Sequence, residues 1–106
     1  MGTLYYGAQR EPIPLDDEVL TCLQLVATSK LRRAESFVIS WVRSDEAGAR
    51  RCILWMHAGL DLEFEFDGVD PVPVHRRMLD AFTNAAHSNR GIQLDAAHAK
   101  DSFAGV

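Results

Sequence analysis

The chain has 106 residues, with 11 lysines and arginines against 15 aspartates and glutamates, and a formal net charge of −4 at pH 7. This charge argues against a protein whose main work is to coat DNA or RNA, because that work requires a positive field. Hydrophobic residues make up 47% and charged residues 25%, as in ordinary globular domains. We expect a single domain over residues 1–95 and a flexible C-terminal tail over residues 96–106.

The apolar runs of the chain are far shorter than the roughly 20 residues that span a bilayer. The opening MGTLYYG also lacks the apolar core of a signal peptide, so we expect a cytoplasmic protein without membrane contact. Cys22 and Cys52 are isolated, and the histidines form no i, i+4 pair. The sequence therefore predicts no metal site and no cofactor, and favours buried free thiols over a disulfide or a reactive thiol.

The first part of the chain shows two extended patterns and then a helical one. Residues 3–7, TLYYG, predict a short strand, and residues 11–15, with two prolines, predict an extended edge piece. Asp16 and Asp17 supply a cap and first-turn negative charge to a helix that should end near Arg33. The apolar residues on one face of this helix are Val19, Leu20, Leu23, Val26, Ala27 and Leu31.

A basic cluster falls in the last turn of this helix. Cations there meet the carbonyl end of the helix dipole, for about 0.3 to 1 kcal/mol each, so helix chemistry alone explains the cluster. The alternative is a grip on nucleic-acid phosphates by several basic residues together. The candidates for such a grip are Lys30, Arg32, Arg33, Arg50 and Arg51, or Arg76 and Arg77 on a second helix.

Three strand patterns follow over residues 35–44, 50–57 and 60–66. We expect residues 45–49, with Gly48 among polar neighbours, to form the hairpin loop between the first two strands. Ala58 and Gly59 predict a tight turn between the second and the third. The three strands should then lie side by side in one antiparallel sheet.

These turns imply a register, because side chains alternate between the two faces of a strand. In this register Trp41 lies opposite Ile53, Ile39 lies opposite Trp55, and Trp55 faces Leu62 on the third strand. The large aromatic residues then share one face, which we expect to form the core. That face holds Phe37, Ile39, Trp41, Ile53, Trp55, Leu60, Leu62, Phe64 and Phe66.

The opposite face of the expected sheet is mixed in character. Its residues on the first two strands are Val38, Ser40, Val42, Cys52, Leu54 and Met56. Left uncovered, they form an apolar patch of the kind that marks a partner site, and we expect a homodimer through it. The alternative is that the N-terminal strand and the tail fold over the patch.

Four carboxylates continue this face along the third strand: Asp61, Glu63, Glu65 and Asp67. Such a row is typical of a solvated edge. The alternatives are that it binds a divalent cation or pairs with Arg43 and Arg50.

A second helix should begin after Asp70, Pro71 and Pro73 and stop near Gly91. Its apolar positions are Val74, Met78, Leu79, Phe82, Ala85 and Ala86. Residues 91–95 suit a short last strand. The order strand, helix, three strands, helix, strand predicts an α+β fold with a mainly antiparallel sheet and two helices packed on one face.

The stretches MGTLYYG, KLRRAESFVISW and ILWMHAGLDLEFEFDG together resemble a family of small actinobacterial proteins of unknown function. Members of that family are often labelled ATP-dependent DNA ligase. The resemblance runs from Met1 to about Leu94 and implies no agreed activity or catalytic residue. Ala34 stands where glycine is usual in the family, and Ala58 and Gly59 stand where proline and serine are common.

The ligase label can be tested on the two lysines of the chain. An adenylating ligase carries its nucleophile in a motif of lysine, any residue, aspartate and glycine. Lys30 is followed by LRR and Lys100 by DSF, so neither lysine fits. The sequence predicts no catalytic residues and favours a small non-catalytic module that self-associates through one sheet face. A nucleic-acid-binding accessory domain is the alternative.

Overall fold

The computed structural model of the protein describes residues 1–94, and the expected tail over residues 96–106 lies outside them. The elements in chain order are β1 (Gly2–Tyr6), β2 (Glu11–Leu15), α1 (Asp17–Arg32), β3 (Phe37–Asp45), β4 (Gly48–Met56), β5 (Leu62–Glu65), α2 (Arg76–Ala86) and β6 (Ile92–Leu94). This order confirms the predicted α+β fold class. Neither helix has the length and apolar character that crossing a bilayer requires.

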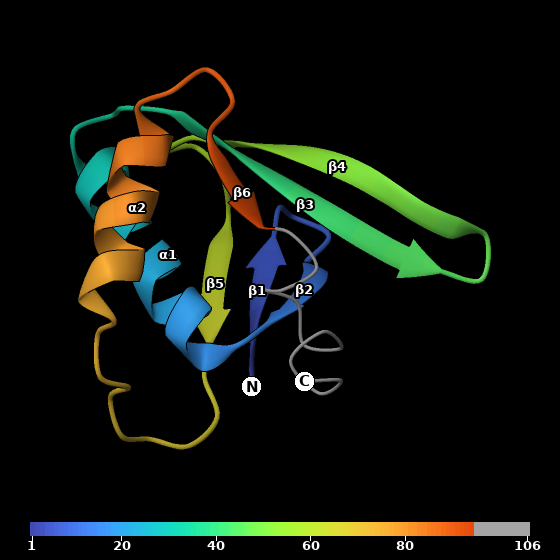
Figure 1. Cartoon of the computed structure of the whole chain (residues 1–106), viewed down its shortest axis with the longest axis horizontal. Helices are drawn as coiled ribbons and strands as arrows, with labels where there is room; N and C mark the ends of the chain where they lie inside the picture. Colours follow the sequence, from blue (N-terminus) through green and yellow to red (C-terminus); the bar gives the residue numbers. More distant parts are fainter. Residues whose placement is uncertain (95–106) are drawn as a thin grey trace.

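The described strands form two three-stranded sheets in place of the single sheet expected. One sheet has the antiparallel order β2-β1-β5, and the other has the order β4-β3-β6, in which β6 runs parallel to β3. The predicted pairing of β4 with β5 is wrong. The chain does turn at Ala58 and Gly59, but it then leaves β4, and β5 pairs with β1. Figure 1 shows the two helices together at one end and the β3–β4 hairpin projecting beyond the other elements.

The β2-β1-β5 sheet has one apolar face. Leu4 lies between Ile13 and Phe64 across the three strands, and both Leu4 and Ile13 are buried. Pro12 and Pro14 are exposed on β2. Proline is tolerated there because β2 is an edge strand and needs few ladder donors, as the sequence predicted.

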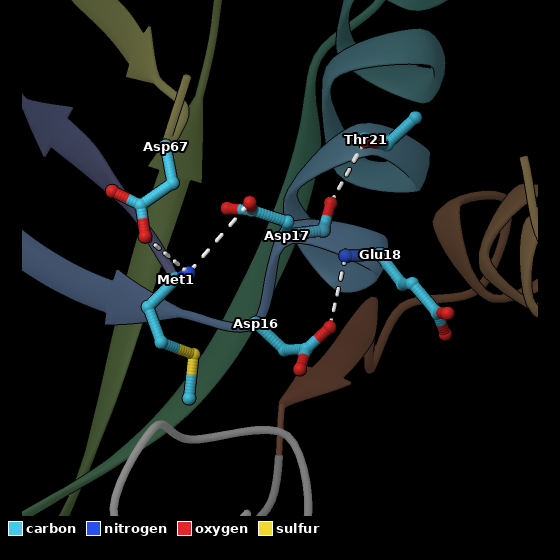
Figure 2. A network of polar contacts seen from close by, with 6 residues as sticks. All are labelled: Met1, Asp16, Asp17, Glu18, Thr21 and Asp67. Carbon is cyan, nitrogen blue, oxygen red and sulfur yellow. Dashed lines mark hydrogen bonds and ion pairs between the residues drawn. The ribbon is translucent and has the colours of Figure 1, made fainter. Parts of the chain in front are cut away.

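The beginning of α1 connects three separate parts of the chain (Figure 2). Asp16 caps the helix as predicted, since its carboxylate accepts a hydrogen bond from the Glu18 N–H at 2.9 Å. The ammonium nitrogen of Met1 lies 2.9 Å from a carboxylate oxygen of Asp67 and 3.6 Å from one of Asp17. The hydrogen bond to Asp67, with the charges of both carboxylates, raises the pKa of the Met1 ammonium group.

The end of α1 is a Schellman motif built on an alanine. The Ala34 N–H donates to the Leu31 carbonyl at 3.0 Å, and the Glu35 N–H donates to the Lys30 carbonyl at 2.9 Å. Ala34 has φ +57°, in the left-handed region that glycine adopts with least strain. The helix therefore ends where the sequence predicted, at the cost of one strained residue.

Replacing Ala34 with glycine should stabilise the protein. The energy cost of the left-handed conformation for alanine is larger than the stability lost when glycine raises the conformational entropy of the unfolded chain. We therefore expect the free energy of unfolding to rise by about 0.5 to 1 kcal/mol. Urea unfolding followed by circular dichroism measures it. Ala58→Gly, in a turn where the alanine does not have a positive φ, should instead lose up to about 1 kcal/mol. If Ala34→Gly lost as much stability as Ala58→Gly, Ala34 would not be strained at the end of α1.

The turn between β3 and β4 is shorter than expected. Asp45 lies opposite Gly48, so only Glu46 and Ala47 connect the strands. Gly48 has φ +115°, a conformation that suits glycine. Both strands thus extend into residues 45–49, which the sequence predicted as a loop. The pairing of β3 with β4 differs by one residue from the predicted register.

This register places the two tryptophans on opposite faces. Trp41 lies opposite Cys52 and is 7% exposed, whereas Trp55 lies opposite Val38 and is 58% exposed. The predicted face shared by all the large aromatic residues is therefore wrong. The inner face holds Phe37, Ile39, Trp41, Cys52, Leu54 and Met56, and the outer face holds Val38, Ser40, Val42, Arg51, Ile53 and Trp55.

The core draws on both sheets and both helices. Its largest fully buried side chains are Leu4, Ile13, Leu15, Leu20, Leu23, Ile39, Met56, Ile92 and Leu94. Cys22 is also buried, and burial raises the pKa of its thiol. Cys52 is half-buried, and both cysteines are free.

Docking of β6 requires glycine at position 91. Gly91 has φ +71°, and a Cβ on this residue would lie 2.0 Å from the Val38 carbonyl oxygen. No side chain can occupy that space without displacing the backbone of β3. Gly68 offers a comparison, because it has φ +76° but a Cβ there would meet nothing within 4 Å.

Gly91→Ala should therefore destabilise the protein far more than Gly68→Ala. Both variants carry left-handed strain of about 1 to 2 kcal/mol, and only Gly91→Ala adds a backbone clash costing about 1 to 3 kcal/mol more. Urea unfolding of the two variants measures the difference. Equal losses would show that β6 does not depend on this close approach.

Candidate interaction surface

The six residues predicted for a partner face are divided between the two faces of the β3–β4 hairpin. Val38, Ser40 and Val42 lie on its outer face, as defined above, and Cys52, Leu54 and Met56 lie on its inner face. Met56 is fully buried, and Cys52 and Leu54 are half-buried against the core. The β4 part of the predicted surface is therefore wrong, and the outer positions of β4 belong to Arg51, Ile53 and Trp55.

Two large apolar side chains of the outer face are exposed. Ile53 is 59% exposed and Trp55 is 58% exposed, at successive outward positions of one strand. Val38, directly opposite Trp55, and Val42, opposite Arg51, are half-buried. Ser40, which lies opposite Ile53 between the two valines of β3, is buried. Directly opposite side chains lie within contact distance in an antiparallel pair, so the exposed surface consists mainly of the β4 side chains, with the valines beside them. An uncovered apolar surface of this kind usually marks a partner site.

β4 also presents a free edge. Within residues 1–94 its sheet has the order β4-β3-β6, which leaves one side of β4 unpaired. The Tyr6 hydroxyl donates to the Trp55 carbonyl at 2.8 Å, which shows that this carbonyl points away from β3. In an antiparallel ladder, alternate residues direct their N–H and C=O groups to the same side. Arg51 and Ile53 therefore present their backbone groups at the free edge as well.

Lys30 is not available to bind a polyanion. Its side chain is buried, with the ammonium nitrogen 2.9 Å from Nδ1 of His87 and 3.3 Å from the Glu35 carboxylate. These contacts join the end of α1 to the end of α2. A hydrophobic contact commonly accompanies a Schellman motif between these two positions, and here the ion pair of Lys30 and Glu35 takes its place.

The other predicted phosphate contacts are not brought together. Arg33 lies 3.4 Å from the Glu35 carboxylate, and Arg32 is exposed at the end of α1. Arg50 and Arg51 are exposed on β4 near the tip of the hairpin. Figure 1 places the end of α1 and this tip at opposite ends of the fold. The described residues therefore form no single basic surface from this set.

Comparison with known proteins gives a family and no activity. Residues 1–97 match the profile of a family described as a domain of unknown function, DUF7882. The chain belongs to this family. No curated protein and no solved structure matches it. Membership confirms the expectation of a family of unknown function.

Three of the four carboxylates in the acidic row contact neighbours in the same part of the fold. Glu63 pairs with Arg10, Glu65 accepts a hydrogen bond from the Tyr5 hydroxyl at 3.3 Å, and Asp67 binds the Met1 ammonium group. Arg43, which the sequence offered as a partner for this row, pairs with Glu11 instead. Within residues 1–94 no group of three or more histidine, cysteine, aspartate or glutamate side chains is placed to hold a metal.

A hollow of about 600 Å³ lies between α2 and β6. Met78, Phe82 and Ile92 are among its apolar lining residues. Two of its polar side chains bond the local backbone: Nδ1 of His75 accepts from the Met78 N–H at 3.2 Å, and the Ser88 hydroxyl donates to the Ala85 carbonyl at 2.8 Å.

The Lys30–Glu35 contact should make stability depend on acid pH. The hydrogen bond from Lys30, followed by the charges of Arg33, Lys30 and His87, lowers the pKa of Glu35. A depressed carboxylate pKa stabilises the fold above the pKa of the unfolded chain, and this stabilisation is lost as pH falls through the folded pKa. Glu35→Gln should lower the free energy of unfolding at neutral pH and flatten its decline in acid.

Urea unfolding at a series of pH values measures this dependence. Glu46→Gln, in the exposed turn of the hairpin, is the control and should follow the wild-type curve. Identical curves for Glu35→Gln and the wild type would contradict a stabilising role for the ion pair.

Proposed function

We propose that this chain is a non-catalytic interaction module that self-associates through the outer face of the β3–β4 hairpin. The observation that carries the proposal is the exposure of Ile53 and Trp55 at successive outward positions of a strand whose other face joins the core. The hairpin projects from the fold, so a second copy can reach this face (Figure 1). A symmetric interface contains each of these side chains twice.

The expected affinity is modest. Covering the exposed parts of two isoleucines and two tryptophans contributes roughly 10 kcal/mol at about 25 cal/mol per Å² of apolar area. Association costs about 4 to 15 kcal/mol in lost translational and rotational freedom. The two terms are comparable, so we expect a dimer that forms at micromolar or higher concentration and dissociates on dilution.

Ile53→Lys should abolish self-association, because it places a charge at the centre of the apolar surface. Size-exclusion chromatography with light scattering over a concentration series measures the effect. Val69→Lys is the matched control, since Val69 is 97% exposed and lies outside the hairpin. We expect this control to dimerise like the wild type. A wild type that stays monomeric at the highest concentration would exclude the proposal.

Nucleic-acid binding is the alternative function. Its support is that Arg50 and Arg51 are exposed on the hairpin and form no ion pair within the described part of the chain. The burial of Lys30 and the separation of the remaining arginines weigh against it. Duplex binding by a monomeric protein, with affinity falling steeply as salt rises, would favour this alternative over self-association.

A further inference from the structure

We propose that the second copy pairs with β4 edge to edge, so that the two β4 strands run antiparallel about a two-fold axis at Ile53. The inference rests on the proposed self-association and specifies its geometry. The β4-β3-β6 sheet of one copy and the same sheet of the second copy would then form one continuous sheet in the dimer. In this arrangement the second copy binds the backbone edge of β4 as well as its outer side chains.

The free backbone of β4 is the first argument. Arg51 and Ile53 direct N–H and C=O groups away from β3, next to the exposed Ile53 and Trp55 side chains. A partner that covers those side chains also removes water from this edge. Buried backbone groups must find hydrogen-bond partners, and a second strand supplies them in register. The surface therefore favours a strand as its partner.

Side-chain matching selects the second copy and the register. Outward-directed residues must lie opposite outward-directed residues, and a symmetric pairing centred at any residue of β4 satisfies this rule. Centring at Leu54 would put Trp55, whose carbonyl already accepts from Tyr6, next to the centre of the ladder and leave Arg51 beyond its end. The centres left to compare are Arg51, Cys52 and Ile53. Centring at Arg51 places two arginines face to face, and centring at Cys52 places Arg51 opposite the partner's Ile53. Centring at Ile53 places Ile53 against the partner's Ile53 and Arg51 against the partner's Trp55, a cation–π pair that occurs twice.

The rest of the sheet is consistent with a closed dimer. Pairing uses the free edge of both copies, so no third chain can add to β4. The far edge of the combined sheet is β6, which has three residues and offers little template for another strand. Tyr6 already donates to the Trp55 carbonyl, so this carbonyl has only its second lone pair for the partner and the ladder ends there.

Arg51→Pro and Arg51→Ala separate edge pairing from other contacts. The Arg51 N–H points to the free edge, so proline removes an intermolecular donor and leaves the β3–β4 ladder intact. We expect Arg51→Ala to weaken dimerisation by about two- to fivefold through the lost cation–π pair. Arg51→Pro should weaken it by about tenfold or more, because the hydrogen bond from the Arg51 N–H to the partner's Trp55 carbonyl is also lost, once in each direction. Sedimentation velocity measures both, and circular dichroism checks that both variants fold.

Oxidative cross-linking of Ile53→Cys tests the register independently of proline. Centring at Ile53 brings the two introduced thiols together, and we expect a covalent dimer that does not form in the wild type. A wild-type dimer linked through Cys52 would instead place the axis at Cys52 and overturn the proposed register. If Arg51→Pro and Arg51→Ala dimerise equally well, edge pairing is overturned although self-association stands. A monomeric wild type removes the proposed function itself.

Discussion

The two-residue turn between β3 and β4 determines which side chains of the hairpin enter the core. Because Asp45 pairs with Gly48, Trp41 turns inward and Trp55 turns outward. A turn longer by one residue would bring Trp55 onto the face of Trp41 and remove the exposed pair on which the candidate surface depends. The core and the interaction surface are therefore two consequences of one backbone register.

The availability of β4 as an edge depends on the other side of β3. Gly91 allows β6 to approach the Val38 carbonyl closely, and β6 then occupies that side in parallel pairing. β3 becomes the central strand of its sheet, and β4 is left with a free side. A residue on the loop after α2 thus contributes to the partner surface without touching it. The same loop region supplies His87, which contacts Lys30 and joins the two helices.

Local sequence patterns predict the helices and most strands. They do not predict which strands pair with each other when these strands are far apart in the sequence. Asp16 caps α1 as expected because capping involves only neighbouring residues. The predicted register of β3 with β4 is wrong because both faces of these strands carry apolar residues. The alternation of apolar and polar side chains therefore does not distinguish a two-residue turn from the longer loop that the sequence suggested. Glycine at position 48, at the end of a short polar stretch, was the available sign of a tighter turn. The pairing of β5 with β1 and the burial of Lys30 depend on segments distant in sequence, which no local pattern reveals.

The distribution of residue types along the hairpin explains why antiparallel self-pairing suits it. Arg50 and Arg51 lie toward the tip, and Trp55 lies toward the base beside Tyr6. Parallel alignment of two such strands would place arginines beside arginines, which repel. Antiparallel alignment places each charged tip beside the aromatic base of the other copy. Arg50 and Arg51 disfavour pairing of β4 with most other strands, and they favour the antiparallel dimer. The same residues therefore contribute both to the affinity of the dimer and to its specificity.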